Sequence, residues 1–431
     1  MTLKEKIECG DARAGVVGLG YVGLPLAVEL AASGLSVTGI DISEEKVATI
    51  NAGRSYILDV PDERVAELVA AGRLRATTSF EATAELDTIN ICVPTPLRKT
   101  REPDLSYIVD SLESLLPHLH TGQLLVLEST TYPGTTEEIV LPMLERVSLV
   151  PGKDVLVAFS PERTDPGNKK YNTRTIPKVV GGIDEASNEA AVALYSRCID
   201  KVVSVSSPRS AEMVKLLENT FRSVNIALVN ELSMMADALG IDVWEVINAA
   251  ATKPFGFMPF YPGPGLGGHC IPVDPLYLTW KARVEGFEPR FIELASQINA
   301  QKPAFVVSRV TQALNDQERA LRNARVLALG VAYKRDVDDV RESPSLDVMT
   351  LLAGKGADIH YCDSFVPSVN LAGRQLEAEA LTVENLAAAD VVVLLTDHSD
   401  FDLKMVAANA RLIVDTRNAF AGIDGDNIIR I

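Results

Sequence analysis

A glycine motif near the N-terminus constrains the fold of this chain more than any other feature. Gly18, Gly20 and Gly23 form a GxGxxG pattern. The pattern directly follows the short apolar run Ala14–Val17 and opens a helical stretch at Leu24–Ala32. Glycines at this spacing allow a tight turn, a close approach of the backbone to a pyrophosphate, and close packing of helix on sheet. The motif therefore predicts a strand–turn–helix unit that holds a dinucleotide phosphate at the helix N-terminus.

An acidic residue follows the motif at a suitable distance. The next predicted strand, Ser36–Ile40, ends at Asp41, which lies 18 residues past Gly23. A carboxylate near this spacing binds a ribose 2′-OH and repels the 2′-phosphate of NADP, so the pattern favours NAD. The alternative is a structural glycine turn in an unrelated α/β protein, and the register of strand, helix and acid disfavours it.

The order of predicted strands and helices divides the chain into three parts. Strand and helix patterns alternate in the first half, which predicts a parallel, doubly wound sheet. Ala211–Leu239 contains neither Pro nor Gly and carries apolar residues at helical spacing, which predicts one long helix. The alternation resumes at Arg325–Gly330. We therefore expect an α/β fold of two Rossmann-like doubly wound domains joined by a central helical domain, with boundaries at 1–209, 210–315 and 316–431.

The remaining elements are predicted by short apolar runs and by helical periodicity. The predicted strands are Thr88–Val93, Leu124–Glu128, Val155–Ser160, Lys178–Gly181, Val202–Val205, Asp358–Tyr361, Val391–Leu395 and Leu412–Asp415. The predicted helices are Glu63–Ala71, Val243–Ala251, Phe291–Asn315 and one that begins near Pro344.

Composition excludes several classes of protein. The 431 residues are 47% hydrophobic and 23% charged, as in ordinary globular proteins. A net charge of −17 argues against a protein that coats nucleic acid or an anionic membrane. We expect neither a signal peptide nor a membrane span, because no apolar run is long enough. The five cysteines contain no CxxC pattern, so we expect no disulfide framework, no zinc site and a cytoplasmic location.

Two local patterns are candidates for catalysis. Lys215 and Asn219 are four residues apart on the long predicted helix and share one face, where a cation and an amide can clamp a hydroxyl or an oxyanion. Taken alone, such a pair is more often a solvated helix face. Cys270 lies in residues 254–275, which are too rich in Pro and Gly for a helix or a strand. A cysteine is usually a small buried hydrophobe, as we expect for Cys92, but among glycines its sulfur is accessible.

Two neighbouring patterns are set aside. His269 is not expected to bind a metal, because no second His or Cys lies at ligand spacing. Tyr277 and Lys281 match the YxxxK pattern of short-chain dehydrogenases. They lie beyond the long helix instead of within one continuous dinucleotide-binding sheet, so we interpret the match as coincidence.

Taken together, the chain resembles the UDP-glucose/GDP-mannose dehydrogenase family over nearly its whole length. The matching segments, in the family's order, are GLGYVGLPLAVE, ICVPTP, STTYPGTT, FSPERTDPG, AEMVKLLENTFRSVNIALVNE, PGPGLGGHCIPVDP, LGVAYKRDVDDVRESP and DTRN. The loop GLGGHCIPVD resembles the UDP-N-acetylglucosamine 6-dehydrogenase branch. UDP-glucose enzymes usually have a GFGGSCFPKD-type loop, and the N-acetylmannosamine branch has GVGGHCIAVDP.

The resemblance implies four-electron oxidation of a sugar C6 alcohol to the uronic acid, with two NAD reduced per sugar. The implied substrate is a UDP-N-acetylhexosamine, first of all UDP-N-acetylglucosamine. The Cys270 thiolate would add to the C6 aldehyde, and the resulting thiohemiacetal would be oxidised to a thioester that water hydrolyses. Lys215 and Asn219 would stabilise the developing oxyanion.

Further roles follow from the family match. Thr130 and Asp274 would hold the water that accepts the first proton, and Glu162 is the glutamate linked to thioester hydrolysis. A second acid that the UDP-glucose branch often has four residues later is replaced here by Pro166. The implied cofactor contacts are Gly18, Gly20, Tyr21, Val22, Gly23, Asp41, Thr95, Thr130 and Arg341. The implied substrate contacts are Glu162, Arg163, Lys215, Asn219, Lys253, Tyr261, Gly265, Gly267, Lys334 and Arg417.

The resemblance also implies a homodimer, or a multiple of dimers, built on the long helix. Lys253 is a candidate for the basic residue that many relatives place in the partner subunit's site.

Several alternatives remain open. The same chemistry could act on UDP-N-acetylmannosamine, UDP-N-acetylgalactosamine or UDP-glucose. A 6-phosphogluconate- or 3-hydroxyisobutyrate-type dehydrogenase shares the first domain and the Lys-xxx-Asn pair, but it makes one NADH per turnover and lacks the cysteine loop. A non-catalytic dinucleotide sensor is disfavoured because the Lys, Asn, Cys and Asp are all present. A UDP-sugar epimerase is disfavoured with the YxxxK match.

Overall fold

The computed structural model describes residues 1–57, 59–98, 102–164, 171–268 and 270–431. Two residues considered above, Pro166 and His269, lie outside the described residues. The chain divides into two compact units. The first comprises Met1–Glu218 and Leu276–Phe287, and the second comprises Asn219–Pro275 and Glu288–Ile431.

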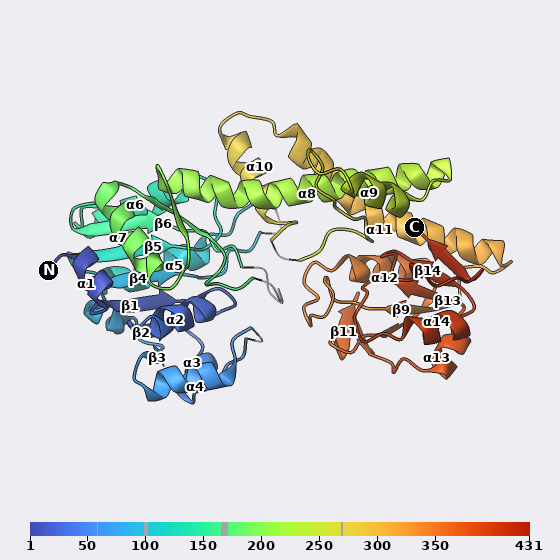
Figure 1. The fold of residues 1–431 in the computed structure, drawn as a ribbon, viewed down its shortest axis with the longest axis horizontal. Helices are drawn as coiled ribbons and strands as arrows, with labels where there is room; N and C mark the ends of the chain where they lie inside the picture. The colour runs from blue at the N-terminus through green and yellow to red at the C-terminus, as the bar shows by residue number, and fades with distance from the viewer. Residues whose placement is uncertain (58, 99–101, 165–170, 269) are drawn as a thin grey trace. The chain divides into compact units, whose positions relative to one another are not determined.

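The first unit is built on an eight-stranded sheet with the order β3-β2-β1-β4-β5-β6-β7-β8 (Figure 1). The strand order reverses beside β1, which confirms the predicted doubly wound arrangement and places the glycine turn at the switch point. The strands are β1 (Arg13–Val17), β2 (Ser36–Ile40), β3 (Leu74–Thr77), β4 (Thr88–Ile91), β5 (Gln123–Leu127), β6 (Val155–Phe159), β7 (Lys178–Gly182) and β8 (Val202–Val205).

One pair of strands differs from the predicted parallel order. β6 and β7 are antiparallel, whereas every other neighbouring pair in this sheet is parallel. A parallel neighbour requires a crossover connection, usually a helix. The described residues between β6 and β7 contain no helix. The expectation of a wholly parallel sheet is therefore wrong at this one connection.

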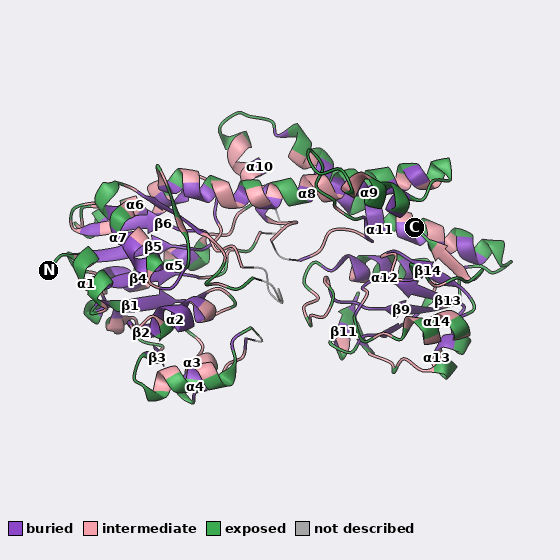
Figure 2. Cartoon of the chain, in the orientation of Figure 1, coloured by how far each residue is buried: buried purple, intermediate pink, exposed green. Residues whose placement is uncertain are grey.

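Helices cover both faces of the first sheet, because its central strands are apolar on both sides. Leu124 and Val126 of β5 pack with residues of α2 and α7, whereas Leu125 and Leu127 pack with residues of α5 and α6. The central strands β4 and β5 are buried along their length (Figure 2), whereas the edge strands β3 and β8 are partly exposed. The helices are α1 (Leu3–Cys9), α2 (Gly23–Ala32), α3 (Glu44–Asn51), α4 (Asp62–Ala70), α5 (Ser106–Leu115), α6 (Leu141–Arg146) and α7 (Glu185–Ser196), with short 3₁₀ turns at Phe80–Glu85 and Leu116–His118 and a π-helical turn at Thr136–Val140.

The second unit contains a parallel five-stranded sheet with the order β10-β9-β13-β14-β15 and a separate hairpin. The sequence predicts four of the five strands but misses β15 and the hairpin. The strands are β9 (Arg325–Leu329), β10 (Asp358–Cys362), β11 (Ser368–Leu371), β12 (Arg374–Glu377), β13 (Val391–Leu394), β14 (Ile413–Asp415) and β15 (Ile428–Arg430). The helices are α9 (Val243–Ala251), α11 (Arg290–Asp316), α12 (Pro344–Gly354), α13 (Val383–Ala388) and α14 (Leu403–Asn409).

The predicted long helix is confirmed as α8 (Pro208–Leu239), a single helix of 32 residues. The segment from Pro254 to Val273 contains no helix or strand in its described residues, and α10 (Asp274–Val284) begins directly after it. Among the described residues, no helix combines the length and apolarity that crossing a membrane requires.

Candidate active site

The three glycines of the turn between β1 and α2 have different surroundings. Gly18 has φ +86°, and a Cβ there would lie 2.7 Å from the carbonyl oxygen of Cys92. A Cβ at Gly23 would lie 1.8 Å from the carbonyl oxygen of Gly18, whereas a Cβ at Gly20 would meet nothing within 4 Å. Packing of the turn therefore requires glycine at Gly18 and Gly23. The open side at Gly20 is where a pyrophosphate can approach the backbone.

Asp41 is fixed beside this turn. Its carboxylate accepts hydrogen bonds from the N–H groups of Leu19 (2.8 Å) and Ser43 (2.9 Å). The Lys46 ammonium lies 3.3 Å from the same carboxylate. The turn and this acid together fit an NAD whose ribose hydroxyls face the carboxylate. Of the other predicted cofactor contacts, Tyr21 is exposed and Val22 directly precedes α2.

Two other predicted cofactor contacts lie in loops after β4 and β5. The carbonyl oxygen of Thr95 accepts a hydrogen bond of 2.5 Å from the hydroxyl of Tyr277 on α10. Thr130 follows Ser129, whose hydroxyl donates to the carbonyl oxygen of Val93 (2.8 Å). The tyrosine of the dismissed YxxxK match thus has a structural contact, which explains why it is buried.

The loop after β6 holds Glu162 in one orientation. Its Oε1 accepts hydrogen bonds from the N–H groups of Arg163 (2.8 Å) and Thr164 (2.7 Å) and from the Thr164 hydroxyl. Its Oε2 lies 3.2 Å from the Nζ of Lys178, the first residue of β7. Burial by itself would raise the pKa of Glu162, but the Lys178 ammonium and these hydrogen bonds lower it to about 2.

The start of α8 meets this loop. The Lys215 ammonium donates a hydrogen bond of 2.7 Å to the carbonyl oxygen of Glu162. The Arg163 guanidinium pairs with Glu218, one turn closer to the end of α8, and donates to the carbonyl oxygen of Pro177. The structure therefore brings together three of the predicted site residues, Lys215, Glu162 and Arg163. The guanidinium of Arg163 contacts Glu218 and Pro177.

The second unit holds the candidate nucleophile. Asn219 of α8 donates a hydrogen bond of 2.5 Å to the carboxylate of Asp274, and both side chains are buried. The N–H of Asp274 in turn donates to the carbonyl oxygen of Cys270 at 2.8 Å. Cys270 is partly exposed, whereas burial raises the pKa of the Cys362 thiol to about 12 and that of Cys92 well above its ordinary value. A nucleophile must form a thiolate, so the exposure of Cys270 suits that role.

The glycine-rich loop before Cys270 packs on the C-terminal sheet domain. A Cβ at Gly263 would lie 2.7 Å from the guanidinium of Arg417. A Cβ at Gly265 would lie 2.7 Å from Pro344, and one at Gly267 would lie 2.7 Å from the same proline. Burial lowers the pKa of Arg417, whose Nε donates to the carbonyl oxygen of Leu395 at 2.8 Å. The structure thus brings the predicted Gly265, Gly267 and Arg417 to one region of the second unit.

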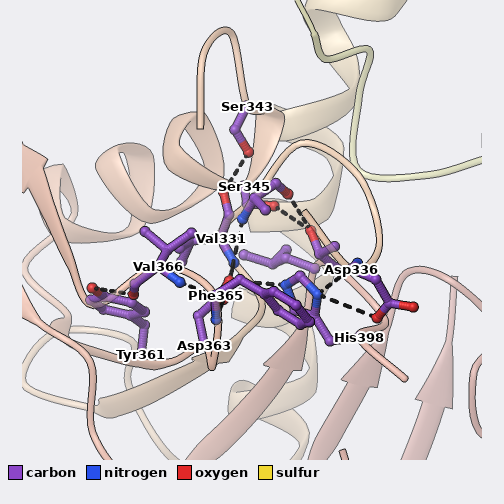
Figure 3. Close-up of polar contacts among 12 residues, drawn as sticks. Val331, Asp336, Ser343, Ser345, Tyr361, Asp363, Phe365, Val366 and His398 are labelled. Carbon is purple, nitrogen blue, oxygen red and sulfur yellow. Dashed lines mark hydrogen bonds and ion pairs between the residues drawn. The ribbon is translucent and has the colours of Figure 1, made fainter. Parts of the chain in front are cut away.

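The segment that carries Lys334 is held by two buried residues that the sequence analysis missed (Figure 3). Asp363 accepts hydrogen bonds from the N–H of Val331 (2.8 Å) and from Nε2 of His398 (3.0 Å). The N–H of Asp336 donates to Nδ1 of the same histidine at 3.0 Å. Together these bonds fix both ends of the segment around Lys334.

The arrangement at Asp363 repeats the one at Asp41. In each case an aspartate follows the second strand and accepts from the N–H of the residue after a glycine that ends the first strand. The glycines, Gly18 and Gly330, have φ +86° and φ +78°. The signal was present in the sequence as LALG followed by YCD, parallel to VVGLG followed by GID.

The remaining predicted residues have local contacts. Arg341 pairs with Asp339 at 2.7 Å. The ring of Tyr261 stacks on Trp244 with centroids 5.7 Å apart, and the Lys253 ammonium lies 5.2 Å from the ring centroid of Phe255. Among the described residues, no group of three or more His, Cys, Asp or Glu side chains is arranged to hold a metal ion.

Known proteins match this chain over nearly its whole length. Three models of the UDP-glucose/GDP-mannose dehydrogenase family match: the NAD binding domain at residues 12–199, the central domain at 209–301 and the UDP binding domain at 327–422. An NDP-N-acetyl-D-galactosaminuronic acid dehydrogenase from Ralstonia solanacearum is 36% identical, covering 96% of this chain and 98% of its own. A UDP-N-acetyl-D-glucosamine 6-dehydrogenase from Pseudomonas aeruginosa is 37% identical, covering 93% and 94%. The solved structure of a UDP-D-ManNAc dehydrogenase from Pyrococcus horikoshii superposes with a TM-score of 0.88 at 33% identity, covering 97% and 98%.

Proposed function

The chain belongs to the UDP-glucose/GDP-mannose dehydrogenase family, and from this premise we propose that it oxidises the C6 alcohol of a UDP-N-acetylhexosamine to the uronic acid. Its activity at the coarser level follows from the family: it is an NAD-dependent UDP-sugar dehydrogenase. UDP-N-acetylglucosamine is the first candidate substrate.

The relatives that match nearly the whole chain support the choice of an N-acetylated sugar. They are dehydrogenases of N-acetylated galactose-, glucose- and mannose-type sugars. The sequence of the loop around Cys270 favours UDP-N-acetylglucosamine among these sugars.

Cys270 carries the covalent steps of the proposal. NAD, when bound, accepts a hydride in each of the two oxidations. Between them the Cys270 thiolate adds to the C6 aldehyde, forming a carbon–sulfur bond and an alkoxide that is protonated to a thiohemiacetal. Loss of the second hydride and of the hydroxyl proton leaves a thioester. Water then breaks the carbon–sulfur bond, which releases the carboxylate and returns the thiolate.

The polar residues assist at separate points. Lys215 holds a positive charge and Asn219 a hydrogen-bond donor for the developing oxyanion, which is the transition-state charge that most needs stabilising. Thr130 and Asp274 hold the water that takes the first proton. Asp274 accepts from Asn219, and its N–H donates to the carbonyl of Cys270, so its position also orients the nucleophile's backbone.

Glu162 serves the hydrolysis of the thioester in this proposal. Its pKa of about 2 means that the carboxylate is ionised at neutral pH. An ionised carboxylate orients the attacking water by accepting a hydrogen bond from it. Because a carboxylate of so low a pKa is a weak base, its part is to position the water. Lys334 and Arg417 bind the UDP part of the substrate, for which the C-terminal domain is the family's UDP binding domain.

The proposal extends to assembly and location. We place the working enzyme in the cytoplasm as a homodimer or a multiple of dimers built on α8. Size measurement in solution tests the assembly directly, and a monomer that is fully active would contradict it.

One assay tests the substrate. NADH formation is measured with UDP-N-acetylglucosamine, UDP-N-acetylgalactosamine, UDP-N-acetylmannosamine and UDP-glucose under identical conditions. The proposal predicts the highest kcat/KM for UDP-N-acetylglucosamine. A highest value for another N-acetylated sugar would correct the epimer, and a highest value for UDP-glucose would contradict the proposed substrate class.

A further inference from the structure

Glu162 belongs to a buried cluster of charged side chains in the first unit. The Nζ of Lys178, which is 4% exposed, lies 2.6 Å from Oε2 of Glu128 and 3.2 Å from Oε2 of Glu162. Glu128 directly follows β5, is 1% exposed, and also accepts hydrogen bonds from Asn90 Nδ2 (2.7 Å) and the Tyr195 hydroxyl (2.7 Å). One buried ammonium is therefore shared between two carboxylates.

We propose that Lys178 is a positioning residue for thioester hydrolysis, because its ammonium holds the carboxylate of Glu162 ionised and in one orientation. The proposal rests on the proposed function, which gives Glu162 its part in that step. Lys178 reaches the reaction only through Glu162, and it has no catalytic contact of its own.

The charge balance of the cluster separates this role from a purely structural one. A buried ion pair is favourable only when each charge is compensated. Lys178 and Glu128 already compensate each other, and Asn90 and Tyr195 both donate to the other oxygen of Glu128, Oε1. Stability of the sheet therefore needs no second carboxylate. Glu162 lies in a loop and not in the sheet. Because its carboxylate is the second one beside a single ammonium, the cluster has a net negative charge.

The contacts of Glu162 show what the ammonium does. Oε1 is held by N–H groups of its own loop, so the contact of Oε2 with Lys178 fixes the other half of the carboxylate. Neighbouring carboxylates raise the pKa of Lys178, against the effect of burial, so the ammonium stays charged throughout the working range of pH. Because the carbonyl oxygen of Glu162 accepts from Lys215, the same residue also connects the cluster to the proposed oxyanion site.

Removal of the ammonium leads to a definite change. In a Lys178→Met variant, Glu162 lies buried beside the uncompensated Glu128, and both burial and like charge favour protonation of Glu162. The pKa of Glu162 then rises from about 2 toward neutrality. A protonated Glu162 no longer offers an ionised acceptor that positions the water, so hydrolysis of the thioester becomes the slow step at low pH.

The test compares the pH dependence of uronic acid formation in four variants. In Lys178→Met, we expect the acid limb of kcat to move up by about two pH units or more, with a covalent sugar adduct on Cys270 seen by mass spectrometry after quenching. Lys178→Gln keeps a hydrogen-bond donor but lacks the charge, so we expect the same shift of the acid limb. It replaces Lys178→Met in the test if that variant does not fold. Lys178→Arg keeps the charge and leaves the limb unmoved.

Glu128→Gln is the matched control. It breaks the same buried ion pair but leaves Lys178 beside Glu162, so we expect no upward shift of the acid limb. The proposal would be overturned if the acid limb of kcat stayed in place in both Lys178→Met and Lys178→Gln. It would also be overturned if Glu128→Gln moved that limb by the same amount.

The pH dependence of Tm tests the change in the pKa of Glu162 without enzyme turnover. A carboxylate whose pKa is raised on folding stabilises the protein below its unfolded pKa, and this stabilisation is lost as pH rises through the folded pKa. Relative to Glu128→Gln, the Tm of the double variant Lys178→Met/Glu128→Gln, in which Glu162 is the remaining carboxylate of the cluster, should therefore fall as pH rises above the ordinary pKa of a glutamate, about 4.3. Parallel Tm profiles would overturn the inference. A wild-type enzyme that forms no uronic acid would instead overturn the proposed function and leave this comparison valid.

Discussion

The amide of Asn219 donates a hydrogen bond to the carboxylate of Asp274, although 55 residues separate them in the chain. The N–H of Asp274 donates to the carbonyl oxygen of Cys270, so the bond also fixes the backbone at the candidate nucleophile. The interaction joins the middle of α8 to the first turn of α10. Asn219 thus has a second task besides the oxyanion contact proposed for it.

Replacement of Asn219 by Ala should lower kcat more than it changes KM. The change removes the oxyanion donor that we propose and leaves the buried carboxylate of Asp274 without one of its partners, so we expect kcat to fall roughly 100- to 1,000-fold. Asn225 on the same helix donates to the carbonyl of Phe221 and has no part in the proposed site, which makes Asn225→Ala the control. Steady-state kinetics checks both, and a kcat of Asn219→Ala within about threefold of the control would contradict the assigned role.

Replacement of Asp41 by Asn should weaken the preference for NAD over NADP. The amide oxygen keeps an acceptor for the N–H of Leu19, whereas the charge that repels a 2′-phosphate is lost. We expect the ratio of kcat/KM for NAD to that for NADP to fall roughly 10- to 100-fold. Glu44→Gln removes a nearby exposed charge and serves as control. An unchanged ratio in Asp41→Asn would show that this carboxylate does not face the ribose.

Replacement of Gly267 by Ala should disturb the glycine-rich loop before Cys270 without affecting the glycine turn between β1 and α2. The new Cβ would lie 2.7 Å from Pro344, 2.9 Å from Tyr333 and 3.1 Å from the carbonyl of Glu342. We expect kcat/KM for the UDP-sugar to fall roughly tenfold or more, with KM for NAD nearly unchanged. A Cβ at Gly354 meets nothing within 4 Å, so Gly354→Ala is the control. Full activity of Gly267→Ala would refute the close packing.

Replacement of Lys302 by Met should stabilise the protein at neutral pH. Lys302 is buried, donates to the Ser233 hydroxyl and lies over the ring of Phe305. Burial lowers its pKa to about 8. Above that pH the folded chain has lost this proton while the unfolded chain keeps it until its ordinary pKa of 10.5, so wild-type stability gains from this group as pH rises across that window.

The Met variant lacks this gain. We expect its free energy of unfolding to exceed that of the wild type by roughly 1–3 kcal/mol at pH 7 and by less at pH 10. Urea unfolding at both pH values measures the difference, with the exposed Lys404→Met as control. An equal difference at the two pH values would contradict the lowered pKa of Lys302.

The sequence was sufficient for features that depend on neighbours along the chain. The glycine turn, Asp41 after β2 and the uninterrupted α8 follow from local spacing and periodicity, and the structure confirms them. Lys215 and Asn219 are likewise predicted from one helix face. The segment before Cys270 could be recognised as a loop because its Pro and Gly content excludes regular structure.

The features that were missed depend on contacts between distant residues. Lys178 and Glu128 are 50 residues apart, and in the sequence each is only a charge at a strand end. Their burial follows from the pairing of strands, as does the contact of Asp363 with His398. The antiparallel pairing of β6 with β7 depends on the connection between them, whose described residues contain no helix.

The central claim is a four-electron oxidation that passes through Cys270, and the amount of NADH formed per UDP-sugar tests it most directly. With limiting UDP-N-acetylhexosamine and excess NAD, the account predicts two NADH per sugar together with one uronic acid. Cys270→Ser should form no acid, while the exposed Cys9→Ser should keep the full yield. One NADH per sugar, or acid formed by Cys270→Ser at the wild-type rate, would contradict the account.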